Sequence, residues 1–404
     1  MKVAVIGGGA AGFFAAISCK TQHPDAAVSI FEKTAKTLTK VKVSGGGRCN
    51  VTNACEPQSE FLRHYPRGQK QLKKTFNHFN RKDTIEWFEK KGVLIKAESD
   101  GRMFPKTDDS QTIIDCLRNE VKNRGASVVT KVAIMALISE PEGFSLTFDS
   151  GQTQFFNHVI VATGGSSKSA SYDWLRKLGH AIVEPVPSLF TFNIQDEPRL
   201  KALMGLAVPY ALVKIQGTKL AQGGPVLITH WGLSGPAALK LSAWGARQLH
   251  EMKYDFNVQI NWAGTMNEEM LRTEVTKTSE QQSKKKIINA KPFELPNRLW
   301  EYLLSRVDLK NDTIWTEVKK KDKNRLINVL LNDEYKVLGK TTFKEEFVTC
   351  GGVELSEVDF NTMESRKVPG MYFAGEVLDI DGVTGGFNFQ AAWSTGFVAG
   401  KLGK

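Results

Sequence analysis

The sequence predicts an α/β protein: a doubly wound parallel-sheet domain, an inserted β-barrel-like domain and a small helical domain. Two observations predict the parallel sheet. A strand–glycine–helix–strand unit occupies residues 2–32, and a second strand–glycine–helix unit occupies residues 371–400. A third observation predicts the inserts, because the pattern after residue 188 changes to short strands and then to polar helices. The expected domains are 1–188 with 342–404, 189–262 with 332–341, and 263–331.

The first unit has the pattern of a dinucleotide-binding motif. Directly after an apolar strand, Gly7, Gly9 and Gly12 give the spacing G-x-G-x-x-G at the start of an alanine-rich helix. Gly7 allows a tight turn, Gly9 lets a pyrophosphate approach the backbone, and Gly12 lets helix and strand pack closely. The helix start offers free N–H groups to the phosphates. Glu32 ends the next strand 20 residues after Gly12, where a carboxylate is expected to bind a ribose hydroxyl.

Two later stretches extend this domain and favour a flavin over a nicotinamide dinucleotide. HVIVATGG (158–165) is an apolar strand that ends in a glycine turn, and MYFAGE (371–376) is a strand that ends beside Glu376. Gly385 and Gly386 then precede a helix of small residues, an arrangement for which an ordinary NAD-binding domain has no need. Backbone N–H groups at the start of that helix would stabilise the negative charge of a reduced flavin.

These motifs resemble those of the FAD proteins related to glutathione reductase and fumarate reductase. A narrower resemblance is to the BaiN/RdsA-type (YhiN-type) bacterial flavoproteins, and it covers essentially the whole chain. The stretches that carry it are SGGGRCNVTN (44–53), GRMFP (101–105), TCGGVEL (349–355) and the closing segment 362–400. Glu376 stands where many relatives of the wider group have Asp. The resemblance implies a glutathione-reductase-like FAD domain, with Val132 facing the adenine and Glu376 contacting the ribityl chain.

It also implies an FAD-dependent oxidoreductase that acts on a small molecule, with reduction of a conjugated C=C bond, such as an enone, as the expected reaction. NAD(P)H is expected as a transient reductant, because the sequence has no second complete G-x-G-x-x-G unit. The residues expected to bind the cofactor are Gly7, Gly9, Ala11, Gly12, Glu32, Lys33, Gly46, Gly47, Arg48, Asn50, Val132, Thr163, Gly164, Gly375, Glu376, Gly386, Asn388 and Phe389.

The segment 42–55 has three interpretations: a redox-active cysteine pair, a backbone cradle, or a surface turn. Cys49 and Cys55 have five residues between them, one more than the C-x4-C pairs of glutathione-reductase-like enzymes. Spacing alone does not exclude a disulfide, which needs Cα atoms within about 7 Å. Three consecutive glycines cost too much folding entropy for a plain turn. We therefore favour the cradle.

In this cradle, the three glycines supply exposed N–H groups. Arg48 is expected to pair with a pyrophosphate or to bond a flavin carbonyl, while Asn50 and Asn53 bond a ring edge. The sequence does not identify a catalytic residue. The weak candidates are His230, as an acid or a hydrogen-bond donor to substrate, and Arg102, as an anion or substrate contact. A structural role for His230 in a turn has equal standing.

Composition limits the partners. The net charge is +11, and seven Lys/Arg without an acid lie between residues 61 and 82, interleaved with aromatic residues. Lysine runs also occur at 284–286 and 319–321. Solvated helix faces, with the aromatic residues packed inward, are favoured over a nucleic-acid surface. An RNA-modifying enzyme that uses 61–82, and a flavin-binding redox sensor without turnover, remain the alternative functions.

Cysteine usage and hydropathy complete these limits. Five cysteines without a close C-x-x-C pair argue against a secreted disulfide framework and a four-ligand zinc site, so no metal is expected. The chain has no apolar stretch near the ~18 residues that span a bilayer. We therefore expect a cytoplasmic protein without a membrane partner. The sequence does not fix the oligomeric state.

Overall fold

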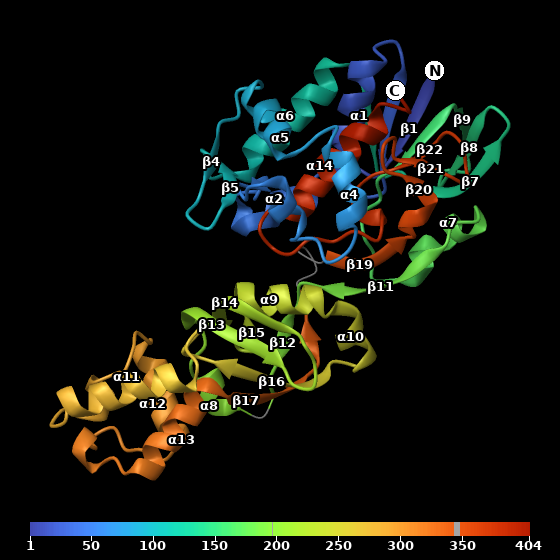
Figure 1. The fold of residues 1–404 in the computed structure, drawn as a ribbon. Coiled ribbons are helices and arrows are strands. Elements are labelled where there is room, and N and C mark those ends of the chain that lie inside the picture. Colours follow the sequence, from blue (N-terminus) through green and yellow to red (C-terminus); the bar gives the residue numbers. More distant parts are fainter. Residues whose placement is uncertain (196, 343–347) are drawn as a thin grey trace. The chain divides into compact units, whose positions relative to one another are not determined.

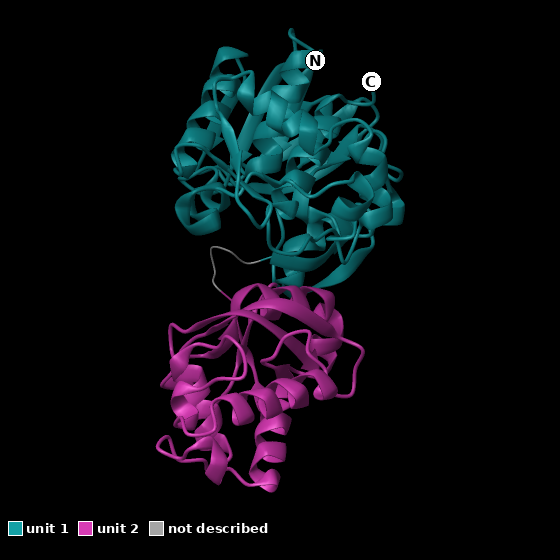
Figure 2. Ribbon diagram, turned by 60° about the vertical axis from the view of Figure 1, so that its left-hand side comes forward, with its two compact units in different colours: residues 1–188, 344–404 teal, residues 189–343 magenta. Residues whose placement is uncertain are grey.

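The computed structural model describes residues 1–195, 197–342 and 348–404. The chain forms two compact units, residues 1–188 with 344–404 and residues 189–343, each with its own main sheet (Figure 2). The return of the chain between the units falls on residues 343–347, outside the described residues.

A seven-stranded sheet forms the centre of the first unit (Figure 1). Its order is β20-β21-β22-β10-β1-β2-β6, and the run from β22 to β6 is parallel. The strands are β1 (Lys2–Ile6), β2 (Ala27–Glu32), β6 (Ser127–Thr130), β10 (His158–Val161), β20 (Val358–Asp359), β21 (Glu364–Ser365) and β22 (Met371–Phe373). The predicted doubly wound sheet is confirmed. Its parallel strands come from both ends of the chain, so both predicted nucleotide motifs belong to one sheet.

Helices α1 (Ala10–Gln22) and α14 (Phe387–Gly400) lie side by side at this sheet, as the blue and red helices of Figure 1 show. Small residues permit the contact. A Cβ placed on Gly396 would lie 2.6 Å from the Ala11 carbonyl oxygen, and one on Gly400 would lie 2.4 Å from the Ala15 carbonyl oxygen. The two helix starts that the sequence assigns to the cofactor therefore belong to one packed pair.

Three smaller sheets complete the first unit. They are β3 (Thr52–Asn53), β5 (Arg102–Pro105) and β4 (Ile95–Ala97); β7 (Ile134–Glu140), β8 (Gly143–Phe148) and β9 (Thr153–Phe156); and β11 (Ile182–Ser188) with β19 (Val348–Val353). The other helices are α2 (Thr39–Gly47), α3 (Gln58–Leu62), α4 (Gln69–Phe76), α5 (Arg81–Glu89), α6 (Ser110–Asn123) and α7 (Asp173–Lys177), with 3-10 turns η1 (Ser169–Tyr172), η4 (Leu355–Glu357) and η5 (Gly375–Val377).

The second unit contains a closed antiparallel sheet with the order β17-β16-β13-β14-β15-β12-β18. Its strands are β12 (Thr191–Asn193), β13 (Ala207–Ile215), β14 (Ala221–Ile228), β15 (Gly232–Ser234), β16 (Asp255–Asn261), β17 (Asp333–Leu338) and β18 (Lys340–Thr341). The two ends of this order are one continuous segment, divided only by Gly339 at φ 85°. The segment pairs with β16 on one side and β12 on the other, so the sheet closes on itself. The predicted β-barrel-like insert is confirmed.

Helices adjoin this barrel and share its core. They are α8 (Pro198–Lys201), α9 (Gly235–Trp244), α10 (Ala246–Glu251), α11 (Glu268–Gln281), α12 (Asn297–Arg306) and α13 (Lys320–Leu331), with η2 (Ile287–Asn289) and η3 (Trp315–Glu317). One cluster of buried side chains includes Trp262 of the barrel and Trp300 of α12. Because this cluster spans both parts, the boundary between a barrel domain and a helical domain stays a prediction. Among the described residues, no helix is long and apolar enough to cross a membrane.

Candidate functional site

The glycines of the first motif differ in their surroundings. Two of them lie where a side chain would collide with the backbone, and one lies beside open space. Gly7 has φ 117°, and a Cβ there would lie 2.3 Å from the Ala162 carbonyl oxygen. A Cβ on Gly12 would lie 2.0 Å from the Gly7 carbonyl oxygen. A Cβ on Gly9 would meet nothing within 4 Å. Gly7 and Gly12 thus allow the close packing of strand and helix, while Gly9 leaves open space at the start of α1.

Glu32 lies beside this loop at the end of β2. Its Oε2 accepts a hydrogen bond from the Gly8 backbone N–H over 2.9 Å, and its Oε1 accepts one from Thr34 over 2.8 Å. Val132 donates its backbone N–H to the Glu32 carbonyl oxygen over 3.1 Å. The neighbouring Lys33 is exposed. The structure therefore places Glu32 beside the glycine loop and Val132 beside Glu32, and their roles toward a ribose and an adenine stay predictions.

The end of β22 also reaches the start of α1. Gly375 has φ 76°, donates its N–H to Thr395 Oγ1 over 2.9 Å, and would place a Cβ 2.8 Å from the Ala11 Cβ. Ala11 and Gly375 are thus neighbours. In the loop after β10, Thr163 is exposed and a Cβ on Gly164 would meet nothing within 4 Å.

Glu376 has two partners that the sequence analysis missed. Its Oε2 lies 2.7 Å from Lys40 Nζ, and its Oε1 accepts a hydrogen bond from the Thr349 backbone N–H over 2.8 Å. The Thr349 hydroxyl is buried and has no hydrogen-bond partner among the described residues. A Cβ on Gly165 would lie 2.5 Å from that hydroxyl and 2.7 Å from Glu376 Oε1. Thr349 belongs to TCGGVEL, whereas no sequence signal marks Lys40.

The segment 44–53 packs against the start of α14. Asn53 donates from Nδ2 to the Gly385 carbonyl oxygen over 2.9 Å, and a Cβ on Gly386 would lie 2.3 Å from the Thr52 carbonyl oxygen. Gly386 is the N-cap of α14, with φ 95° and no side-chain cap. Asn50 accepts a hydrogen bond from the Met103 backbone N–H over 3.2 Å. The structure therefore joins two motifs that lie more than 330 residues apart.

The glycine run itself is an open cradle at two of its positions. The backbone leaves helical geometry at Ser44, and Gly46 and Gly47 have φ of 70° and 86°. A Cβ on Gly46 or Gly47 would meet nothing within 4 Å. The following Cys49 is buried, which raises the pKa of its thiol to about 12. A redox-active thiol needs an accessible thiolate, so burial opposes that role for Cys49.

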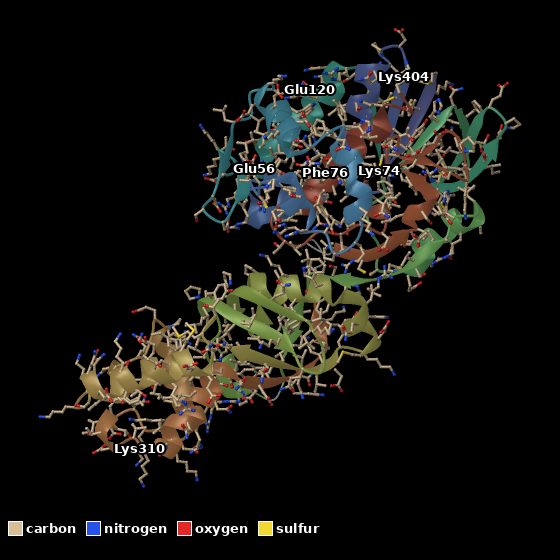
Figure 3. The ribbon with its side chains drawn as sticks, viewed as in Figure 1. Glu56, Lys74, Phe76, Glu120, Lys310 and Lys404 are labelled. Atoms are coloured by element: carbon tan, nitrogen blue, oxygen red, sulfur yellow. The ribbon has the colours of Figure 1, made fainter. Side chains whose placement is uncertain are left out.

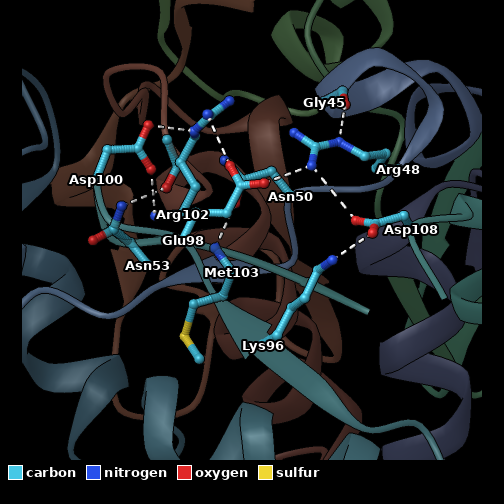
Figure 4. Close-up of polar contacts among 11 residues, drawn as sticks. Gly45, Arg48, Asn50, Asn53, Lys96, Glu98, Asp100, Arg102, Met103 and Asp108 are labelled. Carbon is cyan, nitrogen blue, oxygen red and sulfur yellow. Dashed lines mark hydrogen bonds and ion pairs between the residues drawn. The ribbon is translucent and has the colours of Figure 1, made fainter. Parts of the chain in front are cut away.

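Arg48 and Arg102 share one carboxylate (Figure 4). Glu98 Oε1 lies 2.6 Å from Arg48 Nη1, and Glu98 Oε2 lies 2.9 Å from Arg102 Nη2. The Arg48 guanidinium also lies 3.9 Å from the centre of the Phe104 ring. Asp100 accepts a second hydrogen bond from Arg102 over 2.7 Å. Both arginines therefore have carboxylate partners, and the network orients them beside the cradle.

Of the remaining predicted site residues, Asn388 and Phe389 belong to the first unit and His230 belongs to the second. Asn388 bonds the Gly382 backbone twice, accepting its N–H and donating to its carbonyl oxygen over 2.8 Å each. The Phe389 ring stacks on Trp393, with ring centres 5.6 Å apart. His230 belongs to the second unit, where it is exposed with its ring 4.6 Å from that of Trp231. Asn388 thus shapes the loop before α14.

The basic segment 61–82 buries its aromatic residues, as its helical spacing predicts. Figure 3 labels Lys74 and Phe76 on α4; Phe76 is buried while Lys74 is exposed. Arg67 forms an ion pair with the buried Asp381. The segment therefore contributes to the core of the first unit. Among the described residues, no group of His, Cys, Asp or Glu could hold a metal ion.

Sequence comparison identifies the family. A family model described as the HI0933-like protein Rossmann domain matches residues 1–402. The chain belongs to the HI0933-like family. This HI0933-like protein is 30% identical, over 99% of its length and 98% of the relative, to a 3-dehydro-bile acid delta(4,6)-reductase of Clostridium scindens. It is also 30% identical, over 98% of its length and 96% of the relative, to a ribosomal RNA dihydrouridine synthase of Escherichia coli.

Solved structures support the fold of this HI0933-like protein. A 3-ketosteroid-delta4-(5alpha)-dehydrogenase of Rhodococcus jostii matches with a TM-score of 0.52 and 13% identity, covering 100% of this chain and 96% of the other. A 3-ketosteroid delta1-dehydrogenase of Sterolibacterium denitrificans matches with a TM-score of 0.51 and 13% identity, covering 98% of each chain. The predicted family, Rossmann-type FAD-binding fold and class of flavin-dependent oxidoreductase are confirmed.

Proposed function

We propose that this protein is an FAD-dependent reductase that uses NAD(P)H to saturate a C=C bond conjugated with a carbonyl group. The carrying observation is the chemistry shared by two relatives of equal identity. A bile acid with a 3-oxo group and double bonds at positions 4 and 6 is a conjugated enone. Dihydrouridine is uridine whose C5=C6 bond, conjugated with the C4 carbonyl, has been saturated. The two names therefore describe one bond type in different molecules.

The overall reaction balances with one nicotinamide. Hydride from NAD(P)H ends on the β-carbon of the acceptor, a proton from water ends on the α-carbon, and NAD(P)⁺ is released. FAD, when bound, supplies the two-electron hydride chemistry between the two. The protein's contribution is to bind and orient the reactants and to stabilise charge.

Open positions and polar partners support a nucleotide role for the first unit. Gly9 leaves space at the start of α1, where backbone N–H groups favour a pyrophosphate. Glu32 lies beside the same loop, in reach of a ribose. Gly46 and Gly47 leave space in the cradle, and the uncapped start of α14 favours negative charge. These features fit FAD, and the cofactor-binding roles expected from the sequence stay predictions.

Anaerobic absorbance spectroscopy of the purified protein tests this function. The flavin band is expected to bleach on addition of NADH or NADPH, and to return when a conjugated enone is added. A saturated ketone of the same skeleton is the matched control and should leave the flavin reduced. A flavin that neither nucleotide bleaches would contradict the nicotinamide-driven reductase and favour a sensor. Bleaching without reoxidation by any conjugated acceptor would contradict the proposed acceptor class.

Uracil in RNA is the second candidate acceptor, because the ribosomal RNA dihydrouridine synthase of Escherichia coli has the same 30% identity to the chain as the bile-acid reductase. The same reduced protein can be offered a 3-oxo-4-ene steroid and a uridine-containing RNA in parallel. Reoxidation by one alone assigns the acceptor. Mass spectrometry of the RNA should then show a gain of two hydrogens per modified uridine if RNA is the acceptor.

A further inference from the structure

Two lysine runs of the second unit lie at the same place in the fold. Lys286 forms an antiparallel bridge with Ile314, and the Trp315 N–H donates to the Lys285 carbonyl oxygen over 3.2 Å. The run 284–286 is thereby fixed beside residues 314 and 315, which precede the run 319–321 by only a few residues. The backbone pairing therefore brings the two runs, which begin 35 residues apart in the sequence, to the same part of the second unit.

The six lysines offer their charge to solvent. All of them are exposed. None of the described carboxylates forms a salt bridge with them, in contrast to Arg272 and Arg325, which pair with Glu268 and Asp308. The nearest acids in the sequence are otherwise engaged: Glu317 accepts a hydrogen bond from the Ile314 N–H over 3.3 Å, and Asp322 lies 3.7 Å from Arg325.

A shallow, open depression adjoins the second run. It is lined by Lys320, Lys321, Asn324, Arg325 and Asn328 of α13. The Asn324 oxygen accepts from Arg272, and the Asn328 oxygen accepts from Asn332. What these amides can still offer a ligand is N–H donors. Cations and N–H donors together are the groups that bind phosphate oxygens.

We propose that this lysine surface, residues 284–286 and 319–321 with the exposed polar face of α13, binds the phosphate backbone of RNA. The inference rests on the second candidate acceptor of the proposed function, uracil in RNA, but RNA binding is measured without turnover, so the two can fail separately. Two observations favour RNA over other anionic partners. Among the described residues of the helices α11, α12 and α13, Met270 is the only exposed large apolar side chain, so the surface has no cluster of the apolar anchors by which helices enter membranes. Protein interfaces are depleted of lysine and centred on aromatic anchors, whereas phosphate contacts need lysine and amide donors.

The lysine surface is part of a firmly packed region. A further exposed lysine, Lys310, lies between α12 and α13 and is labelled in Figure 3. The aromatic side chain between the two runs, Trp315, is buried and donates its indole N–H to the Ala290 carbonyl oxygen over 3.0 Å. The lysines are therefore mounted on a fixed core rather than on a loose segment, and substitutions of their exposed side chains should leave that core intact.

Fluorescence anisotropy of the FAD-loaded full chain with a labelled RNA hairpin tests the proposal, at about 50 to 200 mM KCl where phosphate contacts dominate the salt dependence. Two triple lysine-to-glutamine variants cover residues 284–286 and 319–321. The matched control carries Lys70→Gln, Lys73→Gln and Lys74→Gln, which remove the same charge from exposed positions of α4. Each surface variant should weaken binding on the order of tenfold and lower the salt slope by about two to three. The control should bind as the unmodified chain does.

Each other outcome overturns the proposal. Equal losses in all three variants would mean that only net charge matters, and loss in the α4 control alone would assign RNA to the segment 61–82. Displacement of the RNA by poly-glutamate at equal charge concentration would indicate an acidic protein partner. Absence of salt-sensitive binding would remove RNA altogether. The spectroscopic test of the reductase is unaffected by any of these results, so failure of one does not imply failure of the other.

Discussion

Asn53 donates a hydrogen bond to the carbonyl oxygen of Gly385 over 2.9 Å, although 332 residues separate the two in the chain. The same amide accepts the Cys55 backbone N–H over 2.9 Å through its oxygen. Both ends of the side chain are thus used by the protein itself. Asn53 is therefore a positioning residue that joins the glycine-rich segment to the start of α14, and any effect on the flavin passes through this joint.

Asn53→Ala should weaken both the fold and the cofactor site. The substitution leaves the part-buried Gly385 carbonyl and Cys55 N–H without their partner, which costs about 1 kcal/mol of unfolding free energy. FAD affinity should fall because the hydrogen bond that holds the glycine-rich segment against the start of α14 is lost. Urea unfolding and FAD fluorescence titration measure the two effects. Asn77→Ala, at an exposed position after α4, is the control and should change neither. An unchanged FAD affinity in the Asn53 variant would contradict the positioning role.

Gly9→Ala and Gly12→Ala should separate binding from stability. A Cβ on Gly9 enters open space at an ordinary φ of −92°, so stability should change by less than about 0.5 kcal/mol. FAD should bind at least about tenfold more weakly, because the methyl group occupies the space left for the pyrophosphate. A Cβ on Gly12 overlaps the Gly7 carbonyl oxygen, so the fold should lose about 1–3 kcal/mol or more. Equal effects of both variants on folding would contradict this division of roles.

Local patterns predicted the parts of this protein that a local constraint dictates. The strand–glycine–helix units were predictable because glycine spacing records where a backbone must turn tightly or approach closely, as at Gly7 and Gly12. The closed barrel was predictable only as a class. The barrel closes at Gly339, because the segment before this glycine pairs with β16 and the segment after it pairs with β12. The sequence around Gly339 does not indicate this change of partner.

Side-chain roles in the site could not be predicted, because they depend on partners distant in the sequence. Arg48 was expected to bind the cofactor, but the partner that orients it is Glu98, which lies 50 residues away directly after β4. The ion pair between Lys40 and Glu376 spans 336 residues. Charge and amide type indicate what a residue can bind, whereas tertiary contacts decide which partner it has.

Thr349→Val should make the flavin-free protein more stable and bind FAD more weakly. The hydroxyl is buried without a partner, so replacement by an isosteric methyl group removes a desolvation cost of about 1–3 kcal/mol. If FAD satisfies this hydroxyl beside Glu376, the variant loses that hydrogen bond, and Thr349→Ser retains it. Calorimetric FAD titration measures the expected loss of affinity, and urea unfolding of the flavin-free chain measures the expected gain in stability.

Thr75→Val is the matched control for that prediction. Its hydroxyl is equally buried but donates to the Phe360 carbonyl oxygen over 3.0 Å. The control should therefore destabilise the protein by about 1 kcal/mol and leave FAD affinity unchanged. An unaltered FAD affinity in Thr349→Val would show that the hydroxyl does not contact the cofactor.

Stability should fall as pH decreases through the range just below 6.5, in part because of His180. Burial of its side chain lowers the pKa of the imidazole from its usual value of 6.5. In that range the unfolded chain binds a proton that the folded chain does not, so protonation favours unfolding. The contacts agree with a neutral ring: Nδ1 lies 3.0 Å from Glu357 Oε2, and Nε2 lies 3.2 Å from Ser365 Oγ.

His180→Gln should flatten this part of the pH profile, since the variant has no imidazole to titrate. Urea unfolding of the unmodified chain and the variant between about pH 5 and 8 measures the slopes, and only a difference between the slopes reports on the imidazole. The variant is expected to be less stable at pH 8, where the neutral ring keeps both hydrogen bonds. His78→Gln, at an exposed position, should leave the profile unchanged. Parallel profiles for the unmodified chain and His180→Gln would mean that other groups cause the acid destabilisation.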